Sequence, residues 1–207
     1  LTKGLGKSIQ ELMKPSSNNQ KEYDTATFYS ISNCQDGLSR VTLGNFLIKR
    51  VVYEIQEELP FIKNFGTLSP IPGFADWFSY LEDIKIKNIL GKLSNIDLSF
   101  LKSQKLKIGD KRIIENKEAI KKLVSHYIIN EKNNKGLPIN EVSRFHLGNG
   151  AIVDDIIINA NISEVGFKRS FGVMINYLYE LKNIEKNHED YINNKKIIFS
   201  DKIKKFL

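Results

Sequence analysis

Apolar residues recur every three or four positions between Leu43 and Leu59, and this spacing predicts an amphipathic helix. Pro60 follows directly and ends the helix, because proline has no backbone N–H to continue the hydrogen-bond pattern. One face of this helix must therefore be buried. The positions on that face are Leu43, Phe46, Leu47, Val51, Val52, Ile55 and Leu59.

Strand-type residues lie on both sides of this helix. Before it, a strand is predicted from Phe28, and Asp36-Gly37 then indicates a turn. After it, Asn64 to Leu68 is predicted as a second strand that ends at Ser69. Two strands joined by a helix require a parallel crossover, so the pattern predicts an α/β fold. The first strand is expected to contain Phe28, Tyr29, Ile31 and Cys34.

The loop before the helix is a candidate phosphate site. It brings free backbone N–H groups, the cation of Arg40 and the bare backbone of Gly44 to the positive end of the helix dipole. In open α/β sheets, ligands lie beyond the carboxyl ends of the strands, where this loop and Ser69 are expected. The alternative is an ordinary helix start with Thr42 as its N-cap.

Further helices are predicted around this unit. A short one spans Leu5 to Met13, one runs from Phe74 to Ile84, and another from Glu115 to Glu131. Residues 85–112 lose sharp periodicity and are expected to hold one or two short helices.

The carboxyl third mixes strand and helix patterns. Residues 155–160 are rich in β-branched side chains and predict a strand. A helix is predicted next, because apolar residues recur at spacings of four and three. A short helix is expected at 185–193, an extended piece at 197–199, and a last turn capped by Ser200-Asp201. The helical stripe consists of Phe167, Phe171, Met174, Leu178 and Leu181.

His146 is the histidine with the most informative surroundings. It lies between Phe145 and Leu147 and precedes two glycines, so its imidazole is expected on an ordered loop, in either a structural or a catalytic role. His126 falls within a predicted helix and His188 within a charged surface segment, which favours structural roles for both.

Composition narrows the range of partners. The 207 residues, 41% of them hydrophobic, are enough for one domain with a sizeable core. The net charge of +7 comes mostly from scattered lysines, and the basic clusters at 102–112 and 195–205 hold few aromatic residues, which argues against nucleic acid as a partner. No apolar run approaches the roughly 20 residues needed to span a membrane, so no membrane partner is expected. The single Cys34 excludes an internal disulfide and is typical of a reducing compartment.

Five phrases of the chain, in order, resemble the malonyl-CoA decarboxylase family. The resemblance covers nearly the whole chain except roughly residues 85–112. The phrases are FYSISNCQDGL, LGNFLIKRVV, LSPIPGF, RFHLGNGA and MINYLYEL with its IEKNHEDY continuation.

The resemblance implies a fold of the α/β class, a GNAT-like mixed sheet flanked by helices. Residues 1–207 are then expected to be the catalytic domain, with a variable helical insertion at 85–112. The chain opens at Leu1 without an initiator Met, so we expect it to be the carboxyl part of a longer protein whose first strands and helical domain are absent here. The family resemblance also implies a homo-oligomer formed through that helical domain.

The resemblance implies catalytic roles for Ser69 and His146, with Tyr179 near the substrate. For Ser69 alone, the alternative is a helix N-cap followed by proline. At the position of Thr42, some members of the family carry Glu and others a small hydroxyl residue, so the resemblance assigns no acid/base role to Thr42. The loop implied to receive the CoA pyrophosphate consists of Ser39, Arg40, Val41, Thr42, Leu43, Gly44 and Asn45.

The implied reaction is decarboxylation of malonyl-CoA to acetyl-CoA and CO₂. His146 is expected to protonate the enolate, and Ser69 to orient or hydrogen-bond the malonyl group. No cofactor and no metal are expected, since the thioester itself accepts the electron pair. Two alternatives remain, a GNAT-type acyl-CoA-dependent acyltransferase and a non-catalytic acyl-CoA-binding module. The expected location is the cytoplasm in a bacterium, or mitochondria or peroxisomes in a eukaryote.

Overall fold

The described residues form a mixed sheet of four strands in the order β1-β2-β4-β3. This computed structural model describes residues 1–14, 22–29, 44–103 and 106–207. The strands β1 and β2 are parallel, and β4 is antiparallel to both β2 and β3. The predicted α/β class and mixed sheet are confirmed. The strands are β1 (Thr25–Tyr29), β2 (Asn64–Pro70), β3 (Ile152–Ile157) and β4 (Met174–Leu178).

The predicted strand–helix–strand unit is present. Helix α2 (Gly44–Glu58) connects β1 to β2, and the two strands pair in parallel, with Thr25 opposite Asn64. The first strand begins at Thr25, before its predicted start, and includes Phe28 and Tyr29. Ile31 and Cys34 lie outside the described residues.

Short helices surround the sheet. The predicted helix at 74–84 ends at Tyr80, and a separate helix follows it. The predicted helix at Leu5 to Met13 is also shorter in the structure. The interval 85–112 contains most of α4, two 3₁₀ turns and the start of α5. The helices are α1 (Ile9–Leu12), α3 (Phe74–Tyr80), α4 (Asp83–Leu90), α5 (Lys111–Glu115), α6 (Lys117–Ile129), α7 (Glu141–Gly148), α8 (Glu164–Ser170), α9 (Ile184–Asn194) and α10 (Asp201–Lys204), with 3₁₀ turns η3 (Gly91–Leu93) and η4 (Ser99–Lys102).

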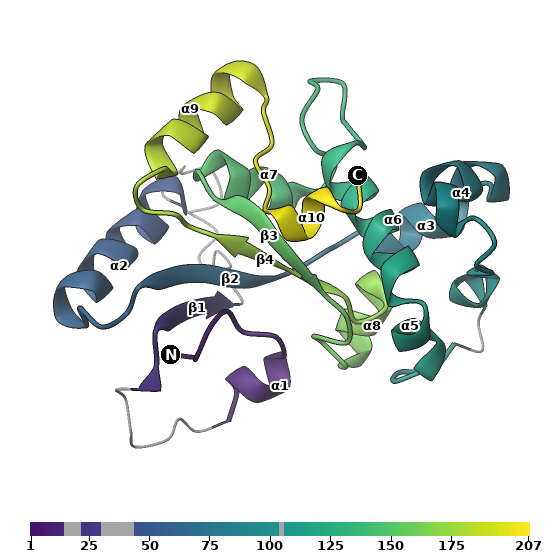
Figure 1. Cartoon of the computed structure of the whole chain (residues 1–207), viewed down its shortest axis with the longest axis horizontal. Helices are drawn as coiled ribbons and strands as arrows, with labels where there is room; N and C mark the ends of the chain where they lie inside the picture. Colours follow the sequence, from purple (N-terminus) through teal and green to yellow (C-terminus); the bar gives the residue numbers. More distant parts are fainter. Residues whose placement is uncertain (15–21, 30–43, 104–105) are drawn as a thin grey trace, which may run out of the picture.

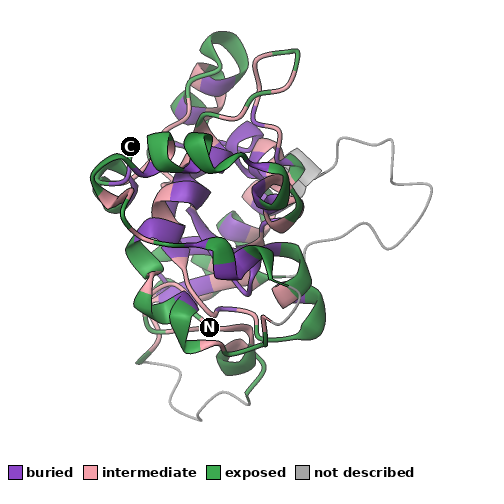
Figure 2. Ribbon diagram, turned by 90° about the vertical axis from the view of Figure 1, so that its right-hand side faces the viewer, coloured by how far each residue is buried: buried purple, intermediate pink, exposed green. Residues whose placement is uncertain are grey.

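Helices cover both faces of the sheet. Figure 1 shows α6, α7 and α10 on one side and α1 on the other. On the α7 side, Phe65, Ile175 and Tyr177 are buried with residues of α6 and α7 in the main core. On the α1 side, Leu68 and Met174 pack against Ile9 and Leu12 in a smaller cluster. The buried residues therefore occupy the middle of the molecule, as Figure 2 shows.

The segment 171–178 differs from its prediction as part of a long helix. Helix α8 ends at Ser170, and Phe171 and Gly172 then adopt left-handed backbone conformations, with φ of 55° and 78°. The chain continues as β4, which lies between β2 and β3. Both faces of this central strand are covered, so apolar residues lie on both of them, and the four-residue spacing of Met174 and Leu178 resembles a buried helix in sequence.

The segment around His146 is a helix, so the prediction of an ordered loop was wrong. Helix α7 begins after Asn140, whose side-chain oxygen accepts a hydrogen bond from the Ser143 N–H at 2.9 Å. Ser143, His146 and Leu147 lie three and four residues apart and are buried on one side of α7. The two glycines lie at its carboxyl end, where they end the helix.

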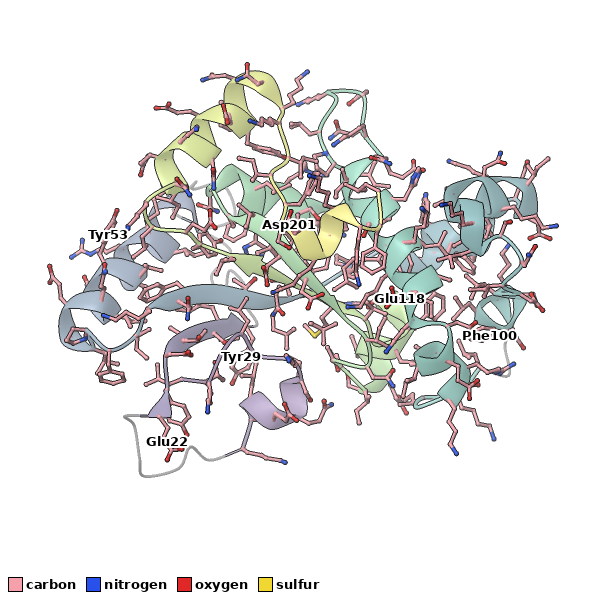
Figure 3. The ribbon with its side chains drawn as sticks, in the orientation of Figure 1. Glu22, Tyr29, Tyr53, Phe100, Glu118 and Asp201 are labelled. Carbon is pink, nitrogen blue, oxygen red and sulfur yellow. The ribbon has the colours of Figure 1, made fainter. Side chains whose placement is uncertain are left out.

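Short segments from both ends of the chain lie along the two outer strands. On β1, Thr2 forms an antiparallel bridge with Thr25. On β3, the Val153 N–H donates to the carbonyl of Ile198 and the Ser200 N–H donates to the carbonyl of Val153, both at 3.0 Å. This confirms the predicted extended piece at 197–199. Helix α10 follows, and Figure 3 shows its first residue, Asp201, over the sheet.

A β-bulge in β3 helps to fix the carboxyl-terminal segment. The register shifts between Val153 and Asp155, and the intervening Asp154 is buried. The Lys202 Nζ lies 2.7 Å from the Asp154 carboxylate, and the Ser200 hydroxyl donates to the Asp154 carbonyl at 2.5 Å. Strand β3 and α10 are therefore joined by both charge and hydrogen bonds.

Candidate active site

Two strands and one helix position the site. Thr67 and Ser69 lie two residues apart on β2, and Tyr177 and Tyr179 have the same spacing at β4. Side chains at this spacing point to the same face of a strand. Thr67 is paired with Tyr177 across the two strands, so all four point toward α7, which carries His146.

Four of these side chains form one chain of hydrogen bonds. The Ser69 Oγ lies 2.9 Å from His146 Nε2 and 2.8 Å from Thr67 Oγ1. The other imidazole nitrogen, Nδ1, lies 2.9 Å from the Tyr179 hydroxyl. The structure therefore brings together Ser69, His146 and Tyr179, the three residues to which the family resemblance assigns roles. Ser69 belongs to β2 and α3 is capped by Gly73, so the alternative that Ser69 is a helix N-cap was wrong.

The imidazole at the centre of this chain is neutral. His146 is 2% exposed, and burial lowers its pKa from 6.5 to about 3. Burial raises the pKa of Tyr179, and its hydroxyl also keeps its proton near pH 7. One imidazole nitrogen therefore carries a hydrogen and the other accepts one, and the arrangement can transfer a proton without holding a charge at rest.

A second polar network supports the first. The Asn140 Nδ2 donates to the Pro72 carbonyl at 2.9 Å, and its Oδ1 accepts from the Ser143 hydroxyl at 3.0 Å. The Ser143 Oγ lies 2.8 Å from the Tyr177 hydroxyl. The Tyr177 ring stacks on the His146 imidazole, with 4.5 Å between ring centroids and 25° between planes. This network therefore fixes both the plane of the imidazole and the segment that follows Ser69.

The predicted CoA loop is described only at its end. Gly44 and Asn45 form the start of α2, whereas Ser39, Arg40, Val41, Thr42 and Leu43 lie outside the described residues. Helix α2 packs against α7, so the end of the predicted loop and the histidine belong to neighbouring elements.

The other two histidines take part in local contacts away from the chain. His126 on α6 stacks on Trp77, and its Nε2 lies 3.3 Å from Glu131. The Nδ1 of His188 donates to the carbonyl of Gly148 at 2.6 Å, which ties α9 to the end of α7. Both contacts agree with the structural roles favoured for these residues.

Metal ligands, membrane-spanning helices and cavities are the other features that could mark a site in the described part of the chain. No group of three or more His, Cys, Asp or Glu side chains there is arranged to hold a metal ion. None of its helices is long and apolar enough to cross a membrane. A hollow of about 410 Å³ lies between α4 and η4, but no side chain of the hydrogen-bonded chain lines it. Buried polar side chains converge instead at Ser69 and His146, which makes this network the candidate site.

Sequence reasoning missed Thr67, Tyr177, Ser143 and Asn140. A signal for two of them exists, because Thr67 alternates with Ser69 and Tyr177 alternates with Tyr179 as on a strand. The prediction of a helix over 167–181 hid the second pair. Ser143 and Asn140 form a local helix cap, and only the fold brings that cap to Tyr177 and Pro72.

The whole chain matches one family model. Residues 1–207 match the malonyl-CoA decarboxylase C-terminal domain. Among curated proteins, the chain is 34% identical over 234 residues to the mitochondrial malonyl-CoA decarboxylase of Anser anser anser, covering 100% of this chain and 45% of that protein. It is also 34% identical to the mitochondrial malonyl-CoA decarboxylase of Rattus norvegicus, covering 98% of this chain and 46% of that protein.

Solved structures of similar sequence share the fold. A malonyl-CoA decarboxylase from Rhodopseudomonas palustris superposes with a TM-score of 0.82 at 35% identity, covering 100% of this chain and 48% of that one. A malonyl-CoA decarboxylase from Agrobacterium vitis gives a TM-score of 0.79 at 34% identity, covering 100% and 51% of the two chains. The chain therefore spans about half the length of the proteins it matches.

Proposed function

The chain belongs to the malonyl-CoA decarboxylase C-terminal domain family, and from this premise we propose that it carries the site where malonyl-CoA loses CO₂ to give acetyl-CoA. The observation that supports this best is the buried chain from Ser69 through His146 to Tyr179. Such a chain supplies what the reaction needs, a hydrogen-bond donor for a developing negative charge and a route for one proton.

Decarboxylation requires the C2–carboxylate bond to break while its electron pair moves into the thioester. The product of this step is CO₂ and an enolate, whose negative charge lies mainly on the thioester oxygen. The hydroxyl of Ser69 donates a hydrogen bond to the malonyl group, which orients it and stabilises this charge as it develops. The enolate then takes a proton at C2 to become acetyl-CoA.

The proton comes from His146 by way of Ser69. With its hydrogen on Nε2, a neutral His146 gives that hydrogen to Ser69 only if Nδ1 gains one from Tyr179, since it would otherwise become an imidazolate anion. In the proposed step the Ser69 hydrogen moves to C2, the Nε2 hydrogen replaces it on Ser69, and the Tyr179 hydrogen moves to Nδ1. The transfer leaves a phenolate, which is far less basic than the enolate and recovers its proton from water.

The experiment that tests the activity is a paired assay of the full-length protein. With malonyl-CoA as the only substrate, CO₂ and acetyl-CoA should appear in equal amounts. Ser69→Ala and His146→Ala are the informative variants, and His126→Ala is the matched control, since that histidine contacts Trp77 and Glu131 instead. Formation of neither product by the parent protein would rule out the proposed reaction.

Binding of CoA is proposed at the loop from Ser39 to Asn45. The support is the start of the α2 helix at Gly44, where backbone N–H groups and the helix dipole favour a pyrophosphate. Gly44→Val should weaken binding of malonyl-CoA and of free CoA alike, because a side chain would crowd the phosphates. Unchanged CoA affinity in a folded variant, measured by calorimetry, would place the phosphates elsewhere.

Two properties of the whole protein remain predictions. The lone cysteine, Cys34, supports a reducing compartment, for which we propose the cytoplasm. The family resemblance suggests a homo-oligomer formed through a helical domain. Light scattering of the full-length protein would measure its oligomeric state directly.

A further inference from the structure

The Thr67 hydroxyl forms one end of the hydrogen-bonded chain, and the proposed reaction gives this hydroxyl no role. Thr67 is 0% exposed, and its Oγ1 lies 2.8 Å from Ser69 Oγ. A valine would fill nearly the same space, so packing alone does not require a hydroxyl at this position. A buried hydroxyl is costly unless it forms hydrogen bonds, and this one contacts the residue proposed to touch the substrate.

The chain contains one hydrogen more than its internal bonds use. Thr67, Ser69, neutral His146 and Tyr179 each carry one hydrogen, and the three contacts between them use three of the four. Within the described residues, neither Thr67 Oγ1 nor Tyr179 has a second hydrogen-bond partner. One hydrogen is therefore left without an acceptor among these four groups.

The two tyrosines indicate the direction of the chain. The Pro72 carbonyl can only accept, so Asn140 donates to it and turns its Oδ1 toward Ser143. The Ser143 hydrogen is then used on Asn140, and Tyr177 must donate to Ser143. A phenol hydroxyl donates more readily than it accepts, which favours the tautomer in which Tyr179 donates to His146 Nδ1 and the Nε2–H donates to Ser69.

We propose that Thr67 is a positioning residue, whose hydroxyl donates to Ser69 and thereby turns the Ser69 hydrogen toward the substrate. The Ser69 oxygen then accepts from Thr67 and from His146, and its own hydrogen has no internal acceptor. Only an acceptor on the ligand, such as the thioester oxygen of the enolate, uses the fourth hydrogen. This inference rests on the proposed function and specifies how the Ser69 hydroxyl hydrogen is directed toward the substrate.

The kinetic test compares three variants of the full-length protein. Thr67→Val should lower kcat for malonyl-CoA by about 10-fold while KM changes by less than about twofold, since the lost contact acts in the transition state. Thr67→Ser keeps a hydroxyl and should restore kcat to within about twofold of the parent. Thr25→Val is the matched control, because Thr25 is equally buried on the neighbouring strand and its hydroxyl bonds to Asp24 instead.

Three outcomes would overturn the inference. They are a parental kcat in Thr67→Val, a loss in Thr67→Ser as large as in Thr67→Val, and an equal loss in the Thr25→Val control. Melting curves show whether each variant is folded. If Thr67→Val does not fold, Thr67→Ala takes its place in the same comparison.

A second measurement does not depend on activity. Nitrogen-15 NMR of histidine-labelled protein, with His146 assigned from His146→Gln, should show hydrogen on Nε2 and none on Nδ1. Hydrogen on Nδ1 would reverse the chain and overturn the role of Thr67 even in an active enzyme. Hydrogen on Nε2 in a protein that releases no CO₂ would support the direction of the chain and reject the proposed reaction instead.

Discussion

The two polar networks that meet at His146 use the same elements but differ in how they can behave. The network of Pro72, Asn140, Ser143 and Tyr177 begins at a carbonyl, which can only accept, so the direction of every bond in it is fixed. The chain from Thr67 to Tyr179 consists of groups that both donate and accept, so its hydrogens can shift along it. The comparison separates bonds that hold the imidazole in place from bonds whose hydrogens shift in the proposed reaction.

The two networks should therefore affect different properties, the first the stability of the fold and the second the turnover of substrate. Removing a member of the fixed network leaves buried donors or acceptors unpaired and should destabilise the fold. Removing a member of the shifting chain should act mainly on the reaction, because its bonds gain their importance when the substrate arrives. The variants below test this separation, from the largest expected effect to the smallest.

Ser69→Ala and His146→Ala break the shifting chain at its centre. Each should lower kcat by about 100-fold or more, the scale of acid/base and oxyanion groups, with a smaller change in substrate affinity. Steady-state CO₂ release and binding of free CoA measure the two effects separately. Near-parental turnover in either variant would remove that residue from the proposed mechanism.

Asn140→Ala breaks the fixed network at its branch point. The substitution leaves the Ser143 N–H, the Ser143 hydroxyl and the Pro72 carbonyl each without one partner. The free energy of unfolding should fall by about 1–3 kcal/mol, as measured by urea denaturation. A variant as stable as the parent protein would show that this network does not stabilise the fold as expected.

His146 should make stability depend on pH. Its pKa is about 3 in the folded protein and 6.5 when unperturbed, so between these values the unfolded chain binds more protons than the folded one. The free energy of unfolding attributable to this group should therefore rise by about 1.4 kcal/mol per pH unit across that window and stay level above it. His146→Gln should remove this part of the slope, whereas Ser143→Ala should leave it unchanged.

The tyrosine pair gives the smallest and sharpest contrast. Tyr177→Phe removes the donor to Ser143 but keeps the ring stacked on the imidazole, and should lower the free energy of unfolding by about 1 kcal/mol with little change in kcat. Tyr179→Phe removes the donor to Nδ1 and should lower kcat by about 10-fold with less effect on stability. The reverse pattern would mean that the roles of the two networks are exchanged.

Sequence reasoning located the parts of the fold where the pattern is strictly local. Helix α2 shows a clear apolar stripe and ends before Pro60, and strand β2 ends at the Ser69-Pro70 pair, so both elements were found with small errors at their ends. Strand β4 was mistaken for a helix because both of its faces are buried. In a helix Tyr177 and Tyr179 would point in different directions, so that error also separated two residues that act on one imidazole.

For a related reason, only some residues of the candidate site could be predicted from the sequence. Ser69 and His146 stood out through the family resemblance, not through their own spacing, since 77 positions separate them. Thr67 and Ser143 carry hydroxyl groups that are common on strands and at helix starts. Their importance comes from partners on other elements, and a pattern of neighbours in sequence contains no information about those contacts.

The attachment of the carboxyl-terminal segment to β3 has a consequence for the behaviour of the protein in a crowded cell. An outer strand with free N–H and C=O groups is a template on which another chain can add a strand, and this is how many aggregates begin. Here both main-chain groups of Val153 are already bonded to 198–200, and the bulge at Asp154 with the charge of Lys202 makes the remaining edge irregular. The same few residues that fasten the last helix thus also shield this side of the sheet from self-association.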